Sequence, residues 1–302
     1  MSEYLTLYLN GDDGSRWDLT NNDDVFLKPG PSMLMDAPAK TYWLETSTGS
    51  HYQGMGFVRR DPVFSVQIHD PDPYVWADLD SRFRMALGMV GEGQFELEAH
   101  TSYGIRRLKM RQLSEPKAYE TEQYERKDPW LTHDSTLAIM AACENPFWEA
   151  DPVELSWELE SGTAGSGTVP FENRGDVPVF WKANATAPAR WRVFDGSWGQ
   201  KTYAKATYPF NRAQDDLNRM VWLPALISGE DLDIDTHPDE PTLIADNGNP
   251  VQARWQSDGI LYPIKPGTKP TQVPIQVEGA HPGAAITFKI PRWYSRPWGV
   301  MV

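Results

Sequence analysis

The sequence predicts an all-β protein with one short helix. Three observations support this prediction: 12% of the residues are aromatic, the chain has 25 prolines and 23 glycines, and short apolar segments alternate with turn residues. Aromatic residues favour strands, whereas proline and glycine favour turns and interrupt long helices. The 302 residues are about twice a common domain length of roughly 150 residues, so we expect two domains.

The first two elements predicted are a β-hairpin and the helix. Tyr4–Leu9 and Arg16–Leu19 read as strands on either side of an acidic turn. This turn lacks the alternating ligands and the distal glutamate of a calcium loop, so we assign it no metal. The helix has Asp72 as N-cap and Pro73 at its first position, and it ends before Gly88. Its apolar stripe predicts core packing. The stripe consists of Trp76, Leu79, Phe83 and Leu87.

A second hairpin is predicted over residues 94–113, which hold the only basic cluster of the sequence. Apolar and charged residues alternate in both halves, as in half-buried strands. With Thr101–Gly104 as the turn, the predicted cross-strand pairs are Glu98 with Arg107, Glu96 with Lys109, Gln94 with Arg111, Leu97 with Leu108, and Phe95 with Met110. Opposite charges across a strand pair contribute about 0.2 to 1 kcal/mol each. The cluster is therefore interpreted as a charge-paired outer face rather than a nucleic-acid site.

The region after this hairpin predicts the domain boundary. Lys117–Lys127 is polar and aperiodic, which indicates a solvated loop or an arm to another subunit, and Thr136–Cys143 reads as a buried strand. The prolines and turn residues of Glu144–Pro152 then predict domains at residues 1–150 and 151–302.

Short strands are predicted to recur through the second domain. Val153–Leu159 alternates like a half-buried strand, and Ser161–Gly167 reads as a flexible loop. The strands that follow are predicted at Pro178–Ala183, Ala189–Phe194, Leu217–Leu223, Leu232–Asp235, Pro241–Ala245, Val251–Trp255, Thr271–Val277 and Ala285–Ile290. This spacing is typical of a β-sandwich.

The composition restricts the partners of the chain. With 28 basic and 42 acidic residues, the net charge is −14, which repels phosphate backbones and anionic lipids. Neither a secretion signal nor an apolar run of about 18 residues is present, so we expect neither membrane insertion nor secretion by that route. The single cysteine, Cys143, lies in an apolar run, which predicts a buried thiol in a reducing cytoplasm.

No sequence motif assigns a catalytic, cofactor or metal residue. A nucleophile elbow and a P-loop are both absent. The acidic run Glu230–Glu240 could bind a cation or serve acid–base chemistry, although contiguous acids are usually solvated. Two alternatives remain open. Distant carboxylates could form a glycosidase pair, and the tryptophans of the second domain could stack on sugar rings.

Four segments of the C-terminal half resemble one known protein family. They are Leu232–Pro238, Asp246–Pro250, Tyr262–Gly267 and Pro291–Trp293. Together they are similar to the C-terminal part of distal tail proteins, often called minor tail proteins, of long non-contractile-tailed phages. In that family an acidic strand precedes an Asx/Gly turn and a proline–glycine turn. The N-terminal half agrees in the order of its elements, so the resemblance covers nearly the whole chain.

The resemblance implies a structural virion protein without catalysis or cofactor. Residues 1–150 would form a tail-tube-like domain and residues 151–302 a galectin-like β-sandwich. Six copies would form a ring at the distal end of the tail, joining the tail tube to the tip or baseplate. The implied partners are further copies of the chain, the tail tube protein, the hub and the tape measure protein. The protein would assemble in the host cytoplasm and lie in the virion, with a carbohydrate-binding adsorption module as the alternative function.

In such a ring, the charged hairpin could set the register between subunits. The candidate interface residues are therefore Glu96, Glu98, Arg107, Lys109 and Arg111. Residues 1–150 hold 14 basic and 24 acidic residues, a net charge of −10. Six such domains around a channel would let DNA slide through without specific binding.

Overall fold

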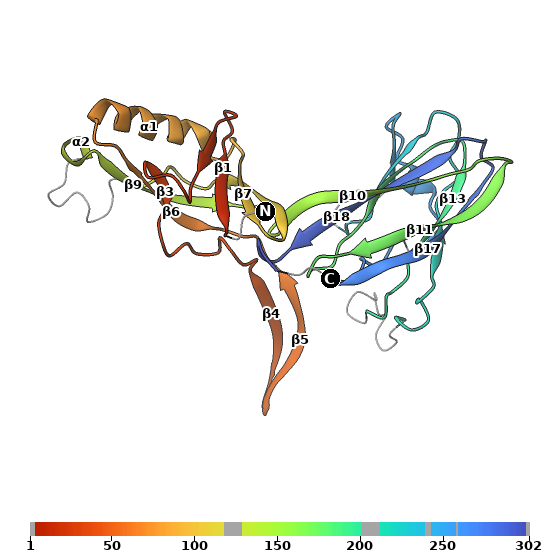
Figure 1. The fold of residues 1–302 in the computed structure, drawn as a ribbon. Coiled ribbons are helices and arrows are strands. Elements are labelled where there is room, and N and C mark those ends of the chain that lie inside the picture. Colours follow the sequence, from red (N-terminus) through yellow and green to blue (C-terminus); the bar gives the residue numbers. More distant parts are fainter. Residues whose placement is uncertain (1–3, 118–128, 201–211, 239–242, 258, 300–302) are drawn as a thin grey trace. The chain divides into compact units, whose positions relative to one another are not determined.

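The protein is described by a computed structural model that covers residues 4–117, 129–200, 212–238, 243–257 and 259–299 (Figure 1). Strands dominate it, so the predicted all-β class is confirmed. The chain divides into two compact units: residues up to Ala150 together with Tyr294–Gly299, and Asp151–Trp293. That these units are independent tail-tube-like and galectin-like domains stays a prediction.

The first unit contains antiparallel strands and two helices. Its elements are β1 (Thr6–Asn10), β2 (Arg16–Asp18), β3 (Val25–Leu27), β4 (Ala39–Thr46), β5 (Gly49–Phe57), β6 (Val63–His69), α1 (Pro73–Ala86), β7 (Phe95–Thr101), β8 (Gly104–Gln112), α2 (Pro129–Thr132) and β9 (Asp134–Ala142). Strand β1 pairs with β2 and β7, β7 with β8, and β8 with β9. Strand β9 also pairs with β6, which pairs with β3. The described strands β4 and β5 pair only with each other.

Helix α1 forms as the sequence predicts. The Asp72 carboxylate accepts hydrogen bonds from the backbone N–H groups of Tyr74 and Val75, which satisfies donors that a helix start leaves free. Trp76 and Phe83 are buried in the core of the first unit. The opening hairpin is also confirmed, with Leu9 opposite Trp17.

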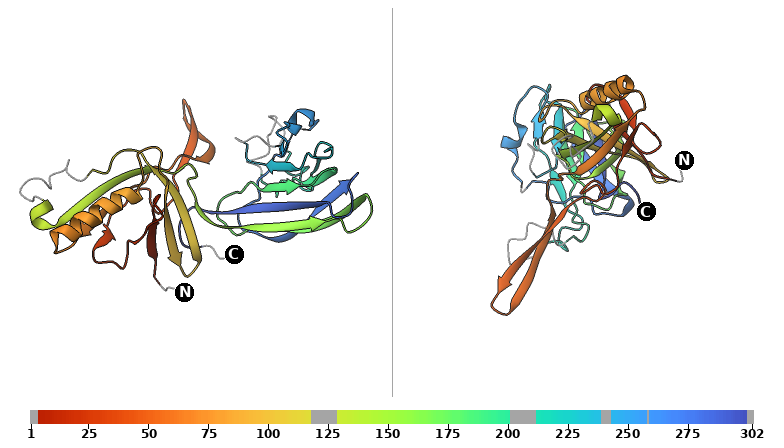
Figure 2. Two further views of the ribbon diagram at one scale, coloured as in Figure 1. Left: turned by 90° about the horizontal axis from the view of Figure 1, so that it is seen from above. Right: turned by 90° about the vertical axis from the view of Figure 1, so that its left-hand side faces the viewer.

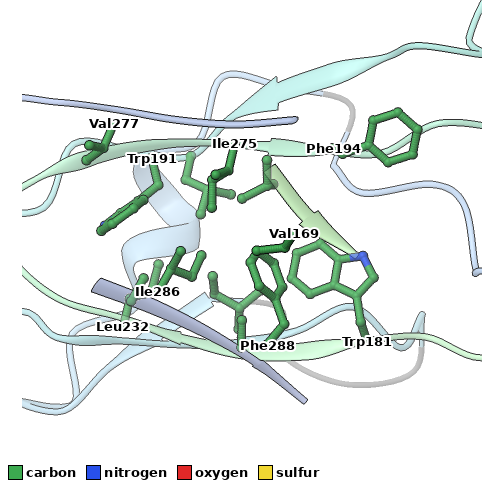
Figure 3. Close-up of a cluster of buried hydrophobic side chains, with 14 of the residues drawn as sticks. Val169, Trp181, Trp191, Phe194, Leu232, Ile275, Val277, Ile286 and Phe288 are labelled. Carbon is green, nitrogen blue, oxygen red and sulfur yellow. The ribbon is translucent and has the colours of Figure 1, made fainter. Parts of the chain in front are cut away.

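The second unit is a β-sandwich. Its elements are β10 (Trp148–Glu158, which begins in the first unit), β11 (Ala164–Asn173), β12 (Lys182–Ala185), β13 (Arg190–Phe194), β14 (Met220–Trp222), β15 (Leu232–Asp235), β16 (Leu243–Ala245), the 3-10 helix η2 (Val251–Arg254), β17 (Thr268–Glu278) and β18 (Ala285–Tyr294). One sheet has the order β11-β17-β13-β14, and the other contains the order β16-β15-β12-β18-β10. Side chains from both sheets form one buried cluster, including Trp191 and Ile275 from the first and Leu232 and Phe288 from the second (Figure 3).

Three local predictions were wrong, each for an identifiable reason. The boundary segment is not all turn, because β10 begins at Trp148, whose indole is fully buried. Residues 164–167 are not a flexible loop but the start of β11, where glycine is needed. A Cβ on Gly167 would lie 1.9 Å from Nε1 of Trp157. Residues Val251–Arg254 form a 3-10 turn after Pro250 instead of a strand. Of the predicted arm Lys117–Lys127, all but Lys117 lies outside the described residues.

Candidate subunit interface

The charged hairpin predicted from the sequence is strands β7 and β8. Their register places Glu98 opposite Arg107 and Glu96 opposite Lys109, as predicted. The apolar partners on the other face are buried in the core of the first unit. These partners are Phe95 with Met110 and Leu97 with Leu108. The alternation of the sequence therefore predicted both the register and the side of the sheet that faces outward.

Glu98 is the centre of the charged face. Its carboxylate accepts hydrogen bonds from Arg16 at 2.7 Å and from Arg107 at 3.0 Å, and His100 Nε2 lies 2.6 Å away. Glu98 is only 6% exposed, and burial by itself would raise the pKa of its carboxyl group. The hydrogen bonds from His100, Arg16 and Arg107 outweigh this effect and lower the pKa to about 2. Glu98 therefore stays ionised in the folded protein at neutral pH.

Glu96 is held less tightly than Glu98. Its Oε1 lies 3.7 Å from Arg107 Nε and accepts a hydrogen bond of 3.3 Å from Asn10. Burial raises the pKa of Glu96, although the Asn10 hydrogen bond and the charges of Arg107 and Lys109 oppose this shift. Of the two glutamates, Glu96 is thus the one whose charge the fold disfavours.

Arg111 differs from the sequence prediction. Its Nε lies 3.1 Å from the Glu144 carboxylate, whereas its expected partner, Gln94, precedes the first residue of β7. Lys109 and Arg111 line a cavity of about 260 Å³ together with Glu144, Asn145 and Glu149. All five predicted interface residues thus belong to neighbouring strands and alternate on one face. Their role between subunits stays a prediction.

Arg106 belongs to the same basic run but has a different role. Its guanidinium stacks on the Tyr294 ring at 3.5 Å and donates to the carbonyls of Arg296 and Gly299, each at 2.7 Å. Arg106 is 2% exposed and lies opposite Ala99 on the buried side of the strand pair. It therefore anchors the segment Tyr294–Gly299 to the first unit.

Arg60 is a second buried arginine that the sequence analysis did not identify. It donates hydrogen bonds to the carbonyls of Met33, Leu34 and Pro146, and burial lowers its pKa to about 10. Through these bonds Arg60 joins its own segment to the segments at Met33–Leu34 and at Pro146. The nearby thiol of Cys143 is buried as predicted, and burial raises its pKa to about 12, so the thiol is unreactive at neutral pH.

Strands β4 and β5 form a hairpin that the sequence analysis missed. All eight residues of β4 are exposed, and the hairpin extends away from the other strands of the first unit (Figures 1 and 2). Five large apolar side chains are between 47% and 57% exposed. They are Tyr42, Trp43, Leu44, Tyr52 and Met55. The run Tyr42–Leu44 before a Ser-Thr-Gly turn was the available signal, but it shows no alternation of apolar and polar residues.

The acidic run of the second unit has structural partners. Glu230 is buried and accepts a hydrogen bond of 2.6 Å from Arg254, while Asp235 pairs with Lys182 at 2.5 Å. Among the described residues, no group of three or more His, Cys, Asp or Glu is arranged to hold a metal ion. In the same part of the chain, no helix is long and apolar enough to cross a membrane.

Comparison with known proteins relates the chain to phage tail proteins. It is 26% identical to minor tail protein Gp27 of Mycobacterium phage D29 and 25% identical to Gp27 of Mycobacterium phage L5, in each case over 97% of both chains. No protein-family model matches. The fold is similar to the crystal structure of the Dit protein (gp 19.1) of phage SPP1, with a TM-score of 0.56 and 10% identity. This match covers 96% of this chain and 99% of the SPP1 protein.

Proposed function

We propose that this chain, a homologue of the minor tail proteins of mycobacteriophages, is a structural protein of a phage tail whose first unit forms a ring of six copies at the distal end. The resemblance predicted from the sequence motifs is confirmed by these homologues, which match along almost the whole chain. They are virion tail proteins and support a structural rather than an enzymatic role. The ring would join the tail tube to the tip or baseplate proteins.

The observation that carries the ring is the exposed hairpin of β4 and β5. An isolated two-stranded sheet is at best marginally stable in water. Contiguous exposed apolar side chains, such as Trp43, Leu44 and Tyr52, mark surfaces that another protein covers. Because further copies of the chain are always present during assembly, a neighbouring copy is the partner that we propose for this hairpin.

A ring of identical chains needs two different surfaces that fit each other, because each copy contacts the next in a head-to-tail manner. The first unit also exposes large apolar side chains near both ends of α1. They are Tyr74 and Val75 at its start and Met85 and Met89 at and after its end. We propose that the hairpin contacts these side chains on the next copy of the chain. The charged face of β7 and β8 would then set the register, as proposed for Glu96, Glu98, Arg107, Lys109 and Arg111.

The charge of the first unit suits a conduit for DNA. Residues 1–150 carry a net charge of −10, and the cations of the charged face are largely paired with carboxylates. Phosphate affinity requires several unneutralised cations. We therefore propose that DNA passes through the ring without specific binding, and that the tail tube, hub and tape measure proteins are the protein partners.

Electron microscopy and mass measurement of the purified full-length protein test this proposal. We expect sixfold rings with six times the 34.2 kDa mass of the chain. The double variant Trp43→Ser/Tyr52→Ser should remain monomeric with an unchanged circular dichroism spectrum. The matched control is Ile227→Ser, which alters a side chain 60% exposed in the second unit and should leave the rings intact.

Different results would contradict different parts of the proposal. A wild-type protein that stays monomeric at its highest soluble concentration would exclude self-assembly into a ring. Rings formed by the hairpin variant would remove β4 and β5 from the interface. Lys109→Glu, measured in the same way, should weaken the rings if the charged face contributes, and an unchanged ring would remove that face.

A further inference from the structure

A cavity of about 430 Å³ lies in the second unit beside β14, one of the two edge strands of the four-stranded sheet. Its size falls within the range of roughly 300 to 1,000 Å³ that is common for small-molecule sites. The residues that line it include two tryptophans and three arginines. They are Trp222, Trp255, Arg190, Arg219 and Arg254. The strands, turns and 3-10 helix that supply these residues come from distant parts of the sequence.

Among the described residues that line the cavity, every charged one is cationic, although the chain as a whole has a net charge of −14. The carboxylates that hold two of the arginines are buried: Asp195 binds Arg219, and Glu230 binds Arg254 at 2.6 Å. Arg219 also donates to the Gly259 carbonyl at 3.0 Å. These contacts fix both guanidinium groups in place, so little side-chain entropy would be lost on binding an acidic group.

The aromatic part of the wall is also fixed. Trp255 Nε1 donates a hydrogen bond of 2.7 Å to the Trp222 carbonyl, so this indole has used its only donor and presents apolar surface. The guanidinium groups of Arg190 and Arg192 lie 4.9 Å and 5.4 Å from the centre of the Trp222 ring. Both indoles are partly exposed. An indole surface of this kind packs against the C–H face of a ring-shaped ligand.

We propose that this cavity binds one acidic sugar unit, such as a uronate, in a glycan of a cell envelope. The indoles would contact the ring, and the cationic wall would receive the carboxylate through charge-assisted hydrogen bonds. A nucleic acid fits less well, because a phosphate backbone gains affinity from a series of cations along a surface, whereas one sugar needs a single pocket. Arg190 also pairs with Glu278 at 3.2 Å, but this contact is exposed, and exposed ion pairs contribute little stability, so a ligand carboxylate can replace it at low cost.

Saturation-transfer NMR with the full-length protein tests this site. The probes are glucuronic acid and glucose, which differ in one carboxylate, and AMP as a nucleotide. We expect glucuronic acid to bind more tightly than either glucose or AMP. Arg190→Gln should weaken glucuronic acid binding about tenfold or more, since a hydrogen bond to a charged group is lost. Trp255→Phe should weaken it less, because part of the aromatic surface remains.

The matched control is Arg174→Gln. Arg174 is an exposed arginine of the second unit that also has an acid partner, Glu172 at 3.1 Å, but it does not line the cavity. This variant should bind glucuronic acid as the wild type does. The proposal is overturned if glucuronic acid does not bind, if Arg190→Gln and Arg174→Gln behave alike, or if AMP binds more tightly than the sugar. None of these results depends on ring formation.

Discussion

Two hairpins of the first unit, β7–β8 and β4–β5, differ in how much of their surface packs against the rest of the chain. In the β7–β8 hairpin one face packs into the core, and most charges of the other face have partners in the hairpin itself, in β1 and β2, or at Glu144. In the β4–β5 hairpin, Phe57 at the base contacts Phe147, but both faces are exposed over most of the length. Trp43 and Tyr52 contact each other there with ring centres 5.3 Å apart. The first hairpin is thus stabilised within its own chain, whereas the second leaves apolar surface in water.

This difference changes where a subunit contact is expected. Charged residues in a sequence often suggest a protein partner. The Glu98 carboxylate, however, already has Arg16, His100 and Arg107 as hydrogen-bond partners within its own chain. An exposed apolar hairpin gains more from a neighbouring protein, since each apolar Å² removed from water contributes about 25 cal/mol. The β4–β5 hairpin is therefore the stronger candidate for the contact, and the charged face is the weaker one.

Among substitutions on the outer faces of the two hairpins, Glu98→Ala is expected to have the largest effect on the stability of a single chain. The change leaves Arg16 and Arg107 without their shared carboxylate, and we expect the free energy of unfolding to fall by about 2 to 3 kcal/mol. Glu45→Ala in the exposed β4 should change it by less than about 0.5 kcal/mol. Urea unfolding measures both changes in free energy. The two substitutions are made in the Trp43→Ser/Tyr52→Ser protein, so that ring assembly does not contribute. Equal effects would mean that the two hairpins do not differ as described.

A smaller loss of folding stability is expected when the pH is lowered. The pKa of Glu98 is lowered in the folded protein to about 2, so its stabilising contribution is present above the pKa of the unfolded chain. This contribution should be lost as the pH falls from about 4.5 towards 2. Unfolding measured across this range should therefore show a steeper loss of stability for the parent protein than for Glu98→Ala. Parallel curves for the two proteins would contradict the role of the ionised carboxylate.

Trp43→Ser is expected to lower the stability of the chain less than Glu98→Ala does. Because the side chain is mostly exposed, its removal costs chiefly the edge contact with Tyr52, so the free energy of unfolding should fall by less than about 1 kcal/mol. Chemical denaturation of the monomer checks this value. A loss similar to that of Leu97→Ala, a buried residue for which about 2 to 5 kcal/mol is expected, would show that the hairpin is part of the core.

The sequence predicted the features that depend on local patterns. Alternation and charge pairing gave the β7–β8 register, and the N-cap Asp72 with the apolar stripe gave α1. Local patterns could not reveal Arg106 as buried, because its ring partner Tyr294 and its acceptor carbonyls lie almost 200 positions further along the chain. They also missed β4 and β5, since strands exposed on both faces have no reason to alternate.

The cavity of the second unit was also beyond what local sequence patterns can predict. The tryptophan content indicated that aromatic surface is available for a ligand, but not which indoles lie side by side. Trp222 and Trp255 are joined by a hydrogen bond between a strand and the residue after a 3-10 turn, and that turn was expected to be a strand. The arginines of the wall are dispersed in the sequence and show no motif there.

The anchoring of Tyr294–Gly299 by Arg106 has a consequence for how the first unit is completed. Since this segment belongs to the same compact unit as the residues up to Ala150, the first unit is built from two segments that are far apart in the sequence. A chain that ended before Tyr294 would leave the buried guanidinium of Arg106 without its ring partner and its two acceptor carbonyls.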